Sequence, residues 1–324
     1  MLRRNLLRNT IWQKNLGLTH DINMKNQIFS DSSVRIYVVP VPKLLRPDHL
    51  PFPYPSYSHD WGVEQDFDFA VRRSSARVLS PDLATHHYLP VFWTRYFVQN
   101  NYGKEGLSEL NLALKEMRLD ENKLFTICQY DDGPLIDLDF GKGLFLASRK
   151  TEMGKDVPLL ASPFPRFIGM RADKNSLLSF TGRTTTHEIR QKMVQEIGHL
   201  PGVVISTHAN SPRAYYKSLL STHVALAPRG YGGSSFRFFE AMQIATVPAL
   251  IGDLDTRPFK QTINWDEISF FAESSAELYE QVSNCSKERL CLMGELAQKV
   301  YWEKLAFGKW TSQLWLQLLN AENN

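Results

Sequence analysis

Cysteine, long apolar runs and net charge are all scarce in this 324-residue chain. The three cysteines, Cys128, Cys285 and Cys291, have no Cys-x-x-Cys spacing, which argues against a disulfide framework or a structural zinc site and favours a reducing compartment. No stretch has the length and apolar character of a membrane span, and the basic segment 1–15 lacks the apolar core of a signal peptide. The net charge of +3, with Lys and Arg scattered, argues against a nucleic-acid surface. We therefore expect a soluble, cytoplasmic protein.

Hydrophobic residues make up 43% of the chain, and its length favours two domains with sizeable cores. Residues 1–33 are polar and poorly periodic, which predicts an N-terminal arm. A strand is predicted over 35–39, followed by a long proline-rich loop over 39–57. Further elements predicted in this half are helices over 64–79 and 106–117, a strand over 124–129, and a linker over 142–166.

From residue 177 onward, strand-like and helix-like segments alternate, which is typical of the βα repeat of a parallel sheet covered on both faces. The predicted strands are 177–180, 203–206, 224–227, 246–251 and 268–272. One predicted helix begins at about residue 187, and four more cover 213–220, 236–244, 276–300 and 308–319. The pattern predicts the α/β class.

The segment 226–253 holds the most informative motif, which reads as strand, turn, helix and strand. Three glycines lie in the turn: Gly230, Gly232 and Gly233. We expect them to take positive φ angles and to let the backbone approach a ligand closely. Either Ser234 or Ser235 is suited to cap the following helix, whose free N–H groups and dipole favour an anion such as a diphosphate.

Charged residues accompany this turn. Arg229 precedes it, and Arg237 lies in the first turn of the predicted helix. Arg237 and Glu240 are on one helix face, so they are placed to reach a phosphate and a ribose diol respectively. The competing interpretation is a solvated surface ion pair beside an ordinary turn.

The order of these features resembles the exostosin-like glycosyltransferases, whose signature reads roughly L-A-P-R-G-x-G-x-x-S-x-R-x-x-E-A-x-x-x-G-x-x-P-V. This chain departs from it at Ala245, where the family has Gly, and at Ala249, where it has Val. The segment 155–163 is similar to the family's linker into its C-terminal domain. The segment 177–197 is similar to its strand–loop–helix block. Residues matching the signature in register are Leu226, Ala227, Pro228, Arg229, Gly230, Gly232, Ser235, Arg237, Glu240, Ala241 and Pro248.

This resemblance implies the GT-B architecture, with two Rossmann-like domains facing across a cleft. The expected parts are an arm over 1–33, an acceptor-binding domain over 34–160, a nucleotide-sugar-binding domain over 161–305, and a C-terminal helix over 306–324 that packs back on the first domain. Relatives are usually found in the Golgi lumen behind an N-terminal anchor. A trimmed luminal chain is therefore the alternative to a cytoplasmic protein.

The implied reaction is inverting and metal-independent, with no cofactor. A sugar such as xylose, galactose or glucuronic acid moves from a UDP-sugar to a hydroxyl of a glycan acceptor. The charge of the leaving diphosphate would be stabilised by arginines and a helix N-terminus. The donor-binding residues are predicted to be Gly182, Arg183, Arg229, Gly230, Ser234, Ser235, Arg237 and Glu240.

The catalytic base is a choice between two carboxylates. Asp131 follows the strand predicted over 124–129 and precedes Gly133, which places it at the carboxyl end of a strand, facing the expected cleft. Glu64 follows the proline-rich loop and begins the first predicted helix. The sequence leaves both candidates open.

Two alternative functions compete with this hypothesis. Three Asp-x-Asp pairs occur, at Asp66 and Asp68, Asp137 and Asp139, and Asp253 and Asp255. Such pairs bind manganese in the other large glycosyltransferase architecture, which predicts a metal-dependent enzyme. The second alternative is a non-catalytic glycan-binding protein that kept the fold, in which the aromatic segment 52–61 would bind the glycan.

Overall fold

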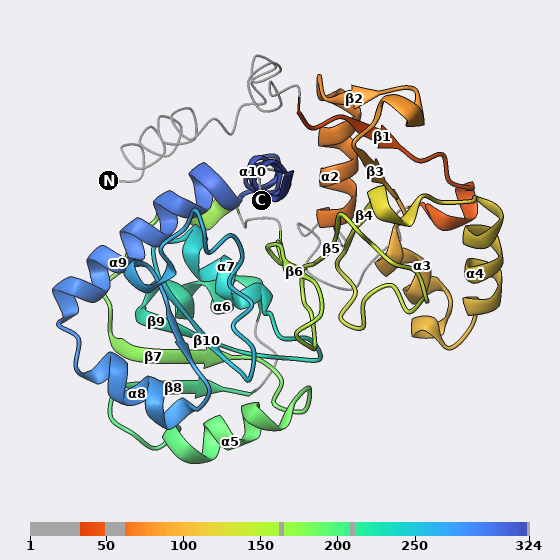
Figure 1. Ribbon diagram of the computed structural model, residues 1–324. Helices are drawn as coiled ribbons and strands as arrows, with labels where there is room; N and C mark the ends of the chain where they lie inside the picture. Colours follow the sequence, from red (N-terminus) through yellow and green to blue (C-terminus); the bar gives the residue numbers. More distant parts are fainter. Residues whose placement is uncertain (1–32, 49–61, 162–164, 208–210, 323–324) are drawn as a thin grey trace.

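The computed structural model describes residues 33–48, 62–161, 165–207 and 211–322. It contains two parallel β-sheets, each packed against helices (Figure 1). The predicted α/β architecture with two Rossmann-like domains is confirmed. Most of the predicted arm and of the proline-rich loop lies outside the described residues.

The first domain is built on a sheet with the strand order β2-β1-β3-β4-β5-β6. Its strands are β1 (Ile36–Val38), β2 (Arg77–Val78), β3 (His86–Tyr88), β4 (Leu124–Cys128), β5 (Gly143–Leu146) and β6 (Lys155–Asp156). Its helices are α2 (Gly62–Arg73), α3 (Trp93–Gln99) and α4 (Leu107–Glu116).

Two expectations for this domain need correction, and one helix was missed. The helix predicted over 64–79 ends at Arg73, and the chain then forms the short strand β2. The segment 142–166 is not a plain linker, because β5 and β6 extend the sheet there. The helix α3 was not predicted at all. These elements are short, so they carry little periodic signal for a sequence pattern to detect.

The second domain has a sheet with the strand order β11-β10-β9-β7-β8. Its strands are β7 (Ser176–Thr181), β8 (Val203–Ser206), β9 (Thr222–Pro228), β10 (Val247–Ile251) and β11 (Phe270–Ala272). Its helices are α5 (Glu188–Ile197), α6 (Pro212–Leu220), α7 (Phe236–Gln243), α8 (Ser275–Ser283) and α9 (Lys287–Val300).

The helix predicted over 276–300 is in fact two helices, α8 and α9. Ser286 separates them, since its side chain accepts a 3.1 Å hydrogen bond from the N–H of Arg289 and caps α9. A π-helical turn, Tyr301–Leu305, continues α9 and leads to α10 (Trp310–Glu322). Short 3₁₀ helices complete the chain: Lys43–Leu45, Pro81–Leu83, Asn101–Gly103, Glu121–Lys123, Pro165–Phe167 and Trp265–Glu267. Within the described ranges, no helix has the length and apolar character needed to span a bilayer.

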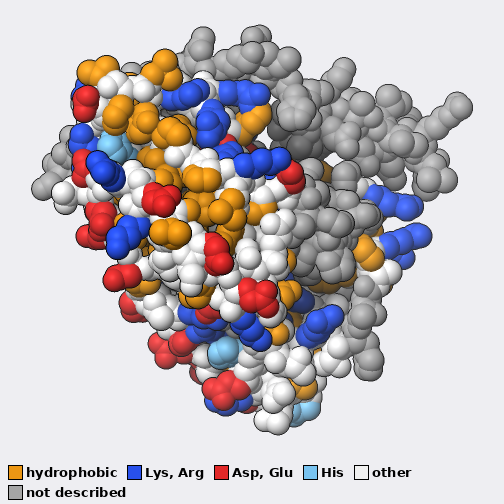
Figure 2. Space-filling model, turned by 90° about the vertical axis from the view of Figure 1, so that its right-hand side faces the viewer, with side chains coloured by type: hydrophobic (Ala, Val, Ile, Leu, Met, Phe, Trp, Pro, Cys, Tyr) orange, Lys and Arg blue, Asp and Glu red, His pale blue; other side chains and the backbone are white. Residues whose placement is uncertain are grey.

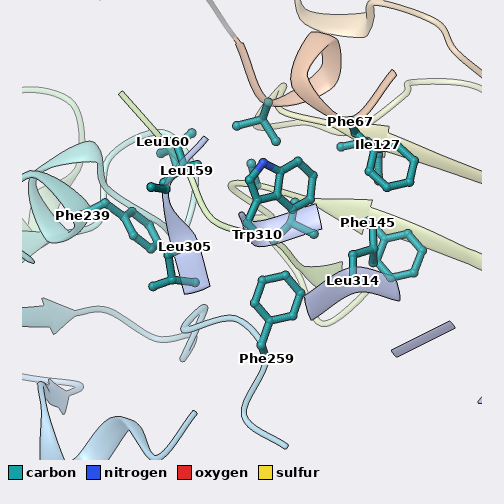
Figure 3. Close-up of a cluster of buried hydrophobic side chains, with 14 of the residues drawn as sticks. Phe67, Ile127, Phe145, Leu159, Leu160, Phe239, Phe259, Leu305, Trp310 and Leu314 are labelled. Carbon is teal, nitrogen blue, oxygen red and sulfur yellow. The ribbon is translucent and has the colours of Figure 1, made fainter. Parts of the chain in front are cut away.

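The two domains share a hydrophobic core around Trp310 of α10, which is fully buried. Asp66 of α2 accepts 2.8 Å hydrogen bonds from the Trp310 Nε1 and from the N–H of Gly308, so α10 is anchored on the first domain. The side chains labelled around Trp310 in Figure 3 come from both domains and from the C-terminal segment: Phe67, Ile127, Phe145, Leu159, Leu160, Phe239, Phe259, Leu305 and Leu314.

The carboxyl edges of the two sheets also meet. The N–H of Gly233, in the turn after β9, donates a 2.9 Å hydrogen bond to the carbonyl of Arg149, which follows β5. A Cβ on Gly232 would overlap Ser148 and lie 2.5 Å from Asp131 Oδ1. The predicted domain boundary at residue 160 stays a prediction, although the strands of the two sheets fall on either side of it.

The glycines of this turn are needed for a reason other than the one predicted. Gly230, Gly232 and Gly233 are not among the residues with positive φ, so the expectation of a left-handed turn is wrong. A side chain on Gly232 or Gly233 would collide with the first domain. Close approach between the two domains is therefore what excludes a Cβ at these two positions.

Candidate functional site

Arg237 projects from the first turn of α7 toward the end of β7. Its Nε donates a 2.7 Å hydrogen bond to the carbonyl of Thr181, and its guanidinium lies 5.3 Å from the centre of the Phe180 ring. A Cβ on Gly182 would lie 2.7 Å from the Arg237 Cζ. Gly182 therefore leaves the space that the guanidinium occupies, and two of the predicted donor residues lie side by side.

Glu240, one turn further along α7, is buried and accepts a 2.5 Å hydrogen bond from the Tyr215 hydroxyl. Burial raises the pKa of Glu240, while the Tyr215 hydrogen bond and the nearby charge of Arg237 act in the opposite direction. The surface ion pair weighed against the functional interpretation does not describe this arrangement, since each of the two charged residues has a different partner. Tyr215 comes from α6, and no sequence signal pointed to it.

Arg229, at the end of β9, is buried and forms an ion pair with Asp253, which follows β10. Behind it, the buried Arg190 of α5 donates hydrogen bonds of 2.9 Å and 3.1 Å to the carbonyls of Arg229 and Pro228. Arg190 also donates a 3.0 Å hydrogen bond to the carbonyl of Arg183, whose own side chain is exposed. The sequence analysis missed Arg190, which ties the loops after β7 and β9 together.

Two buried polar atoms beside these loops have no hydrogen-bond partner in the described structure, the Arg229 Nε and the Thr186 Oγ1. A Cβ on Gly230 would lie 3.9 Å from the Thr186 hydroxyl, so this hydroxyl faces the glycine turn. His187 caps α5 by accepting a 3.3 Å hydrogen bond from the N–H of Ile189, and burial followed by the Arg229 charge lowers the pKa of His187. Unsatisfied donors beside a helix N-terminus are suited to an anion.

The two serines before α7 are buried. Ser235 occupies the N-cap position with an extended backbone, as predicted, but its side chain makes no capping hydrogen bond. Ser234 is outside the cap position. The first N–H groups of α7 are therefore not satisfied by a Ser235 cap.

Asp131 lies in the loop after β4, against the Gly232 turn of the second domain. Burial raises the pKa of this carboxyl group, while a hydrogen bond with Ser148 and the charges of Lys150 and Arg229 lower it in part. The first domain thus presents a carboxylate to the loop that carries the predicted donor residues.

Glu64 is held in a different environment, almost fully buried near the start of α2. Its carboxylate accepts a 2.9 Å hydrogen bond from the Thr94 hydroxyl, a 3.2 Å bond from the Thr94 N–H and a 2.9 Å bond from the N–H of Gln129. Burial raises the pKa of Glu64 to about 7 despite these donors. The geometry is that of a buried carboxylate joining the beginning of α3 to the end of β4.

The Asp-x-Asp pairs are largely engaged in other contacts. Asp68 forms ion pairs with two arginines, Asp255 with Arg257 and Lys260, and Asp253 with Arg229. Asp66 accepts the hydrogen bonds from α10 described above. Asp137 and Asp139 are exposed. In the described part of the chain, no three His, Cys, Asp or Glu side chains form a group that could hold a metal ion.

Comparison with known proteins gives a family match over most of the second domain. Residues 156–280 match the family model of the exostosin GT47 domain. Exostosin-1 of Drosophila melanogaster is 27% identical over 182 residues, which are 46% of this chain and 24% of that protein. The Exostosin-1 homolog of Caenorhabditis elegans is 34% identical over 89 residues, which are 27% of this chain and 23% of that protein. The chain thus spans about a quarter of the length of these relatives.

Among solved structures, TarM aligns with 67% of this chain and 59% of its own, at 10% identity and a TM-score of 0.36. The matched segment 156–280 runs from β6 to α8, so it contains the loops after β7 and β9 that carry the predicted donor residues. Residues 156–280 of this chain are thus similar to the exostosin GT47 domain, and parts of the chain are similar to two Exostosin-1 proteins.

Proposed function

We propose that this protein is a glycosyltransferase that moves a sugar from a UDP-sugar to a hydroxyl group of a glycan, with inversion and without a metal. The observation that carries the proposal is the position of Arg237 and Glu240 within the segment that matches the exostosin GT47 domain, on one helix beside two glycine-containing loops. Xylose, galactose, glucuronic acid or a similar sugar is the proposed donor group.

The unpartnered atoms near the glycine turn support the donor side of the proposal. Arg229 Nε and Thr186 Oγ1 are buried donors without a partner in the described structure, and the N-terminus of α5 lies next to them. A diphosphate leaving group would satisfy such donors as its charge grows. We infer that Glu240 of α7, whose carboxylate accepts a hydrogen bond from Tyr215, also accepts hydrogen bonds from a ribose.

Asp131 is the better candidate for the base. Asp131 lies against the turn of the donor loop. The carboxylate of Glu64, in contrast, already accepts hydrogen bonds from Thr94 and Gln129 within the first domain. An inverting transfer needs one base within hydrogen-bond reach of the acceptor hydroxyl. The raised pKa of Asp131 also makes it a stronger proton acceptor than an exposed aspartate.

The test is calorimetric titration of UDP into the purified protein, with and without EDTA, followed by turnover assays with a panel of UDP-sugars. Arg237→Ala and Glu240→Ala are each expected to cost at least about ten-fold in donor use, since each removes a charged contact. Asp131→Asn is expected to keep UDP binding and to lose turnover. Arg213→Ala, at an exposed position of α6, and Asp132→Asn are the matched controls.

Wild-type kinetics in both donor-side variants would overturn the site. Activity that EDTA abolishes, with Asp137→Ala more damaging than Arg237→Ala, would establish the metal-dependent alternative. Glycan binding without UDP binding or turnover would instead identify a non-catalytic glycan-binding protein.

A further inference from the structure

A cysteine, a histidine and a lysine lie together at the amino edge of the second sheet, against α9. His223 is the second residue of β9, Lys174 comes two residues before β7, and Cys291 lies near the start of α9. The donor loops follow the opposite ends of β7 and β9, and the start of α9 lies on the side of the second domain that faces away from the first (Figure 1). This cluster is therefore separate from the proposed donor site.

The thiol of Cys291 is exposed and has a base beside it. Its Sγ lies 3.9 Å from the Nδ1 of His223, a residue that is 6% exposed. Burial lowers the pKa of His223, the charges of Lys174 and Lys287 lower it further, and Glu288 acts in the opposite direction. A neutral imidazole with its proton on Nε2 can take the thiol proton at Nδ1, and the resulting thiolate is a nucleophile.

The packing of α9 brings the amine of Lys174 to the same place. A Cβ on Gly294, one helical turn after Cys291, would lie 2.5 Å from the carbonyl oxygen of Ala245, so α9 lies directly on the segment that leads into β10. The Nζ of Lys174 donates a 3.0 Å hydrogen bond to the Oγ1 of Thr246, the next residue of that segment. The amine and the thiol therefore adjoin one short stretch of α9, and their charges interact.

The amine of Lys174 differs from the lysines of the open surface. Figure 2 shows Lys and Arg side chains at the surface of the molecule, where water stabilises their charge. Lys174 is partly buried, and burial lowers its pKa to about 8; Cys291 acts in the opposite direction, and the charge of Arg171 adds to the lowering. A larger fraction of Lys174 is therefore the neutral amine, which is the nucleophilic form.

We propose that Lys174 is an acylation site that receives its acyl group from a small-molecule thioester by way of Cys291. In the first step, the Cys291 sulfur attacks the thioester carbonyl, His223 takes the thiol proton, and the leaving thiolate departs and takes up that proton. In the second step, the neutral amine of Lys174 attacks the new thioester, its C–S bond breaks, and the proton lost by the amine restores the Cys291 thiol. The sum converts one thioester and one amine into one amide and one free thiol.

The difference in exposure sets the order of the two steps. Cys291 is exposed and Lys174 is partly buried, so a bulky thioester reaches the sulfur more easily than the amine. Transfer from Cys291 to Lys174 is then a reaction between two neighbouring groups of one molecule, which proceeds at a high effective concentration. An amide is more stable than a thioester, so the acyl group ends on Lys174.

The experiment is incubation of the purified protein with acetyl-coenzyme A at about pH 8, near the pKa of Lys174, followed over time by peptide mass spectrometry. Hydroxylamine cleaves thioesters and leaves amides intact, so it distinguishes an acetyl group on Cys291 from one on Lys174. Acetylation of Lys174 is expected to be about ten-fold or more faster than that of two exposed lysines, Lys287 on α9 and Lys192 on α5.

Variants separate the two steps. Cys291→Ser, at an exposed position, is expected to slow acetylation of Lys174 about ten-fold, because a hydroxyl group is a weaker nucleophile than a thiol. Cys285→Ser, at a partly buried cysteine between α8 and α9, is the matched control and is expected to change nothing. Lys174→Arg removes the acceptor amine, so a hydroxylamine-sensitive acetyl group is expected to accumulate on Cys291.

An acetylation rate of Lys174 equal to that of Lys192, or a rate that Cys291→Ser leaves unchanged, would overturn the proposal. Preferential acetylation of Lys287, which lies one turn before Cys291 on α9, would overturn it as well. A wild-type protein that keeps the acetyl group on Cys291 and forms no amide at Lys174 would show that the second step does not occur, and this result would also overturn it.

Discussion

The pKa of Glu64 is raised to about 7 because burial removes the carboxylate from water. The hydrogen bonds from Thr94 and Gln129 favour the ionised form and offset only part of this effect. The ordinary value for a glutamate is 4.5. The folded protein therefore binds this proton more tightly than the unfolded chain does. The stabilisation is fully present below about pH 4.5 and is lost as the pH rises through 7.

A Glu64→Gln variant removes this titration. The free energy of unfolding of the wild type, measured relative to that of the variant, is expected to fall by about 3 kcal/mol between pH 4.5 and pH 8, since one pKa unit corresponds to about 1.4 kcal/mol. Urea unfolding at a series of pH values measures it. Glu109→Gln, on the exposed face of α4, is the control. Parallel curves for the wild type and Glu64→Gln would contradict the burial argument.

At the scale of single elements, the end of α7 shows a local conflict. Ala245 has a φ of 60°, the left-handed conformation that glycine adopts at a helix C-terminus. The N–H groups of Ala245 and Thr246 donate to the carbonyls of Met242 and Ala241, at 3.4 Å and 3.1 Å, so this conformation closes the helix. The exostosin signature has glycine at this position, and the alanine carries a conformational cost.

We expect Ala245→Gly to raise the free energy of unfolding by about 0.5–1 kcal/mol, because relief of the left-handed strain exceeds the added backbone entropy of glycine. Denaturant unfolding measures the change. Ala214→Gly, at an exposed position on α6, is the matched control, and it is expected to lower stability by up to about 1 kcal/mol. Destabilisation by Ala245→Gly would show that its methyl group contributes more through packing than the strain costs.

At the scale of the whole molecule, α10 joins the two domains. Trp310 is buried in a core cluster that includes residues from both sheets, and Asp66 of the first domain accepts its indole hydrogen bond. The ring of Phe67 lies 5.8 Å from the ring of Trp310. Contact between the two domains therefore depends on a helix that comes last in the chain.

Trp310→Ala is expected to lower the free energy of unfolding by about 3–5 kcal/mol, because it leaves a large cavity and removes one of the hydrogen bonds that the Asp66 carboxylate accepts. Hydrogen exchange is expected to show the loss of protection first in α2 and α10, with β9 of the second sheet least affected. Leu316→Ala, at a position of the same helix that is 42% exposed, is expected to change stability by about 0.5 kcal/mol or less. Equal effects of the two variants would argue against this role of Trp310.

The secondary structure of the second domain was predicted from the sequence more completely than that of the first. Its helices are long enough to show periodicity, and β10 and the part of β9 from Val224 onward are continuous apolar runs that predict buried parallel strands. Arg237 and Glu240 were placed on one helix face by their spacing alone. In the first domain, β5, β6 and α3 are short, and their boundaries depend on pairing with distant segments.

The sequence by itself determined the α/β class, the βα order of the second domain and the helix face that carries Arg237 and Glu240, because these follow from local periodicity and turn residues. Only the tertiary structure decided that Tyr215 bonds Glu240, that Arg190 ties together the loops after β7 and β9, and that Gly232 lies against Asp131. Each of these contacts joins residues from separate elements, and their packing is set by the shared core rather than by local sequence.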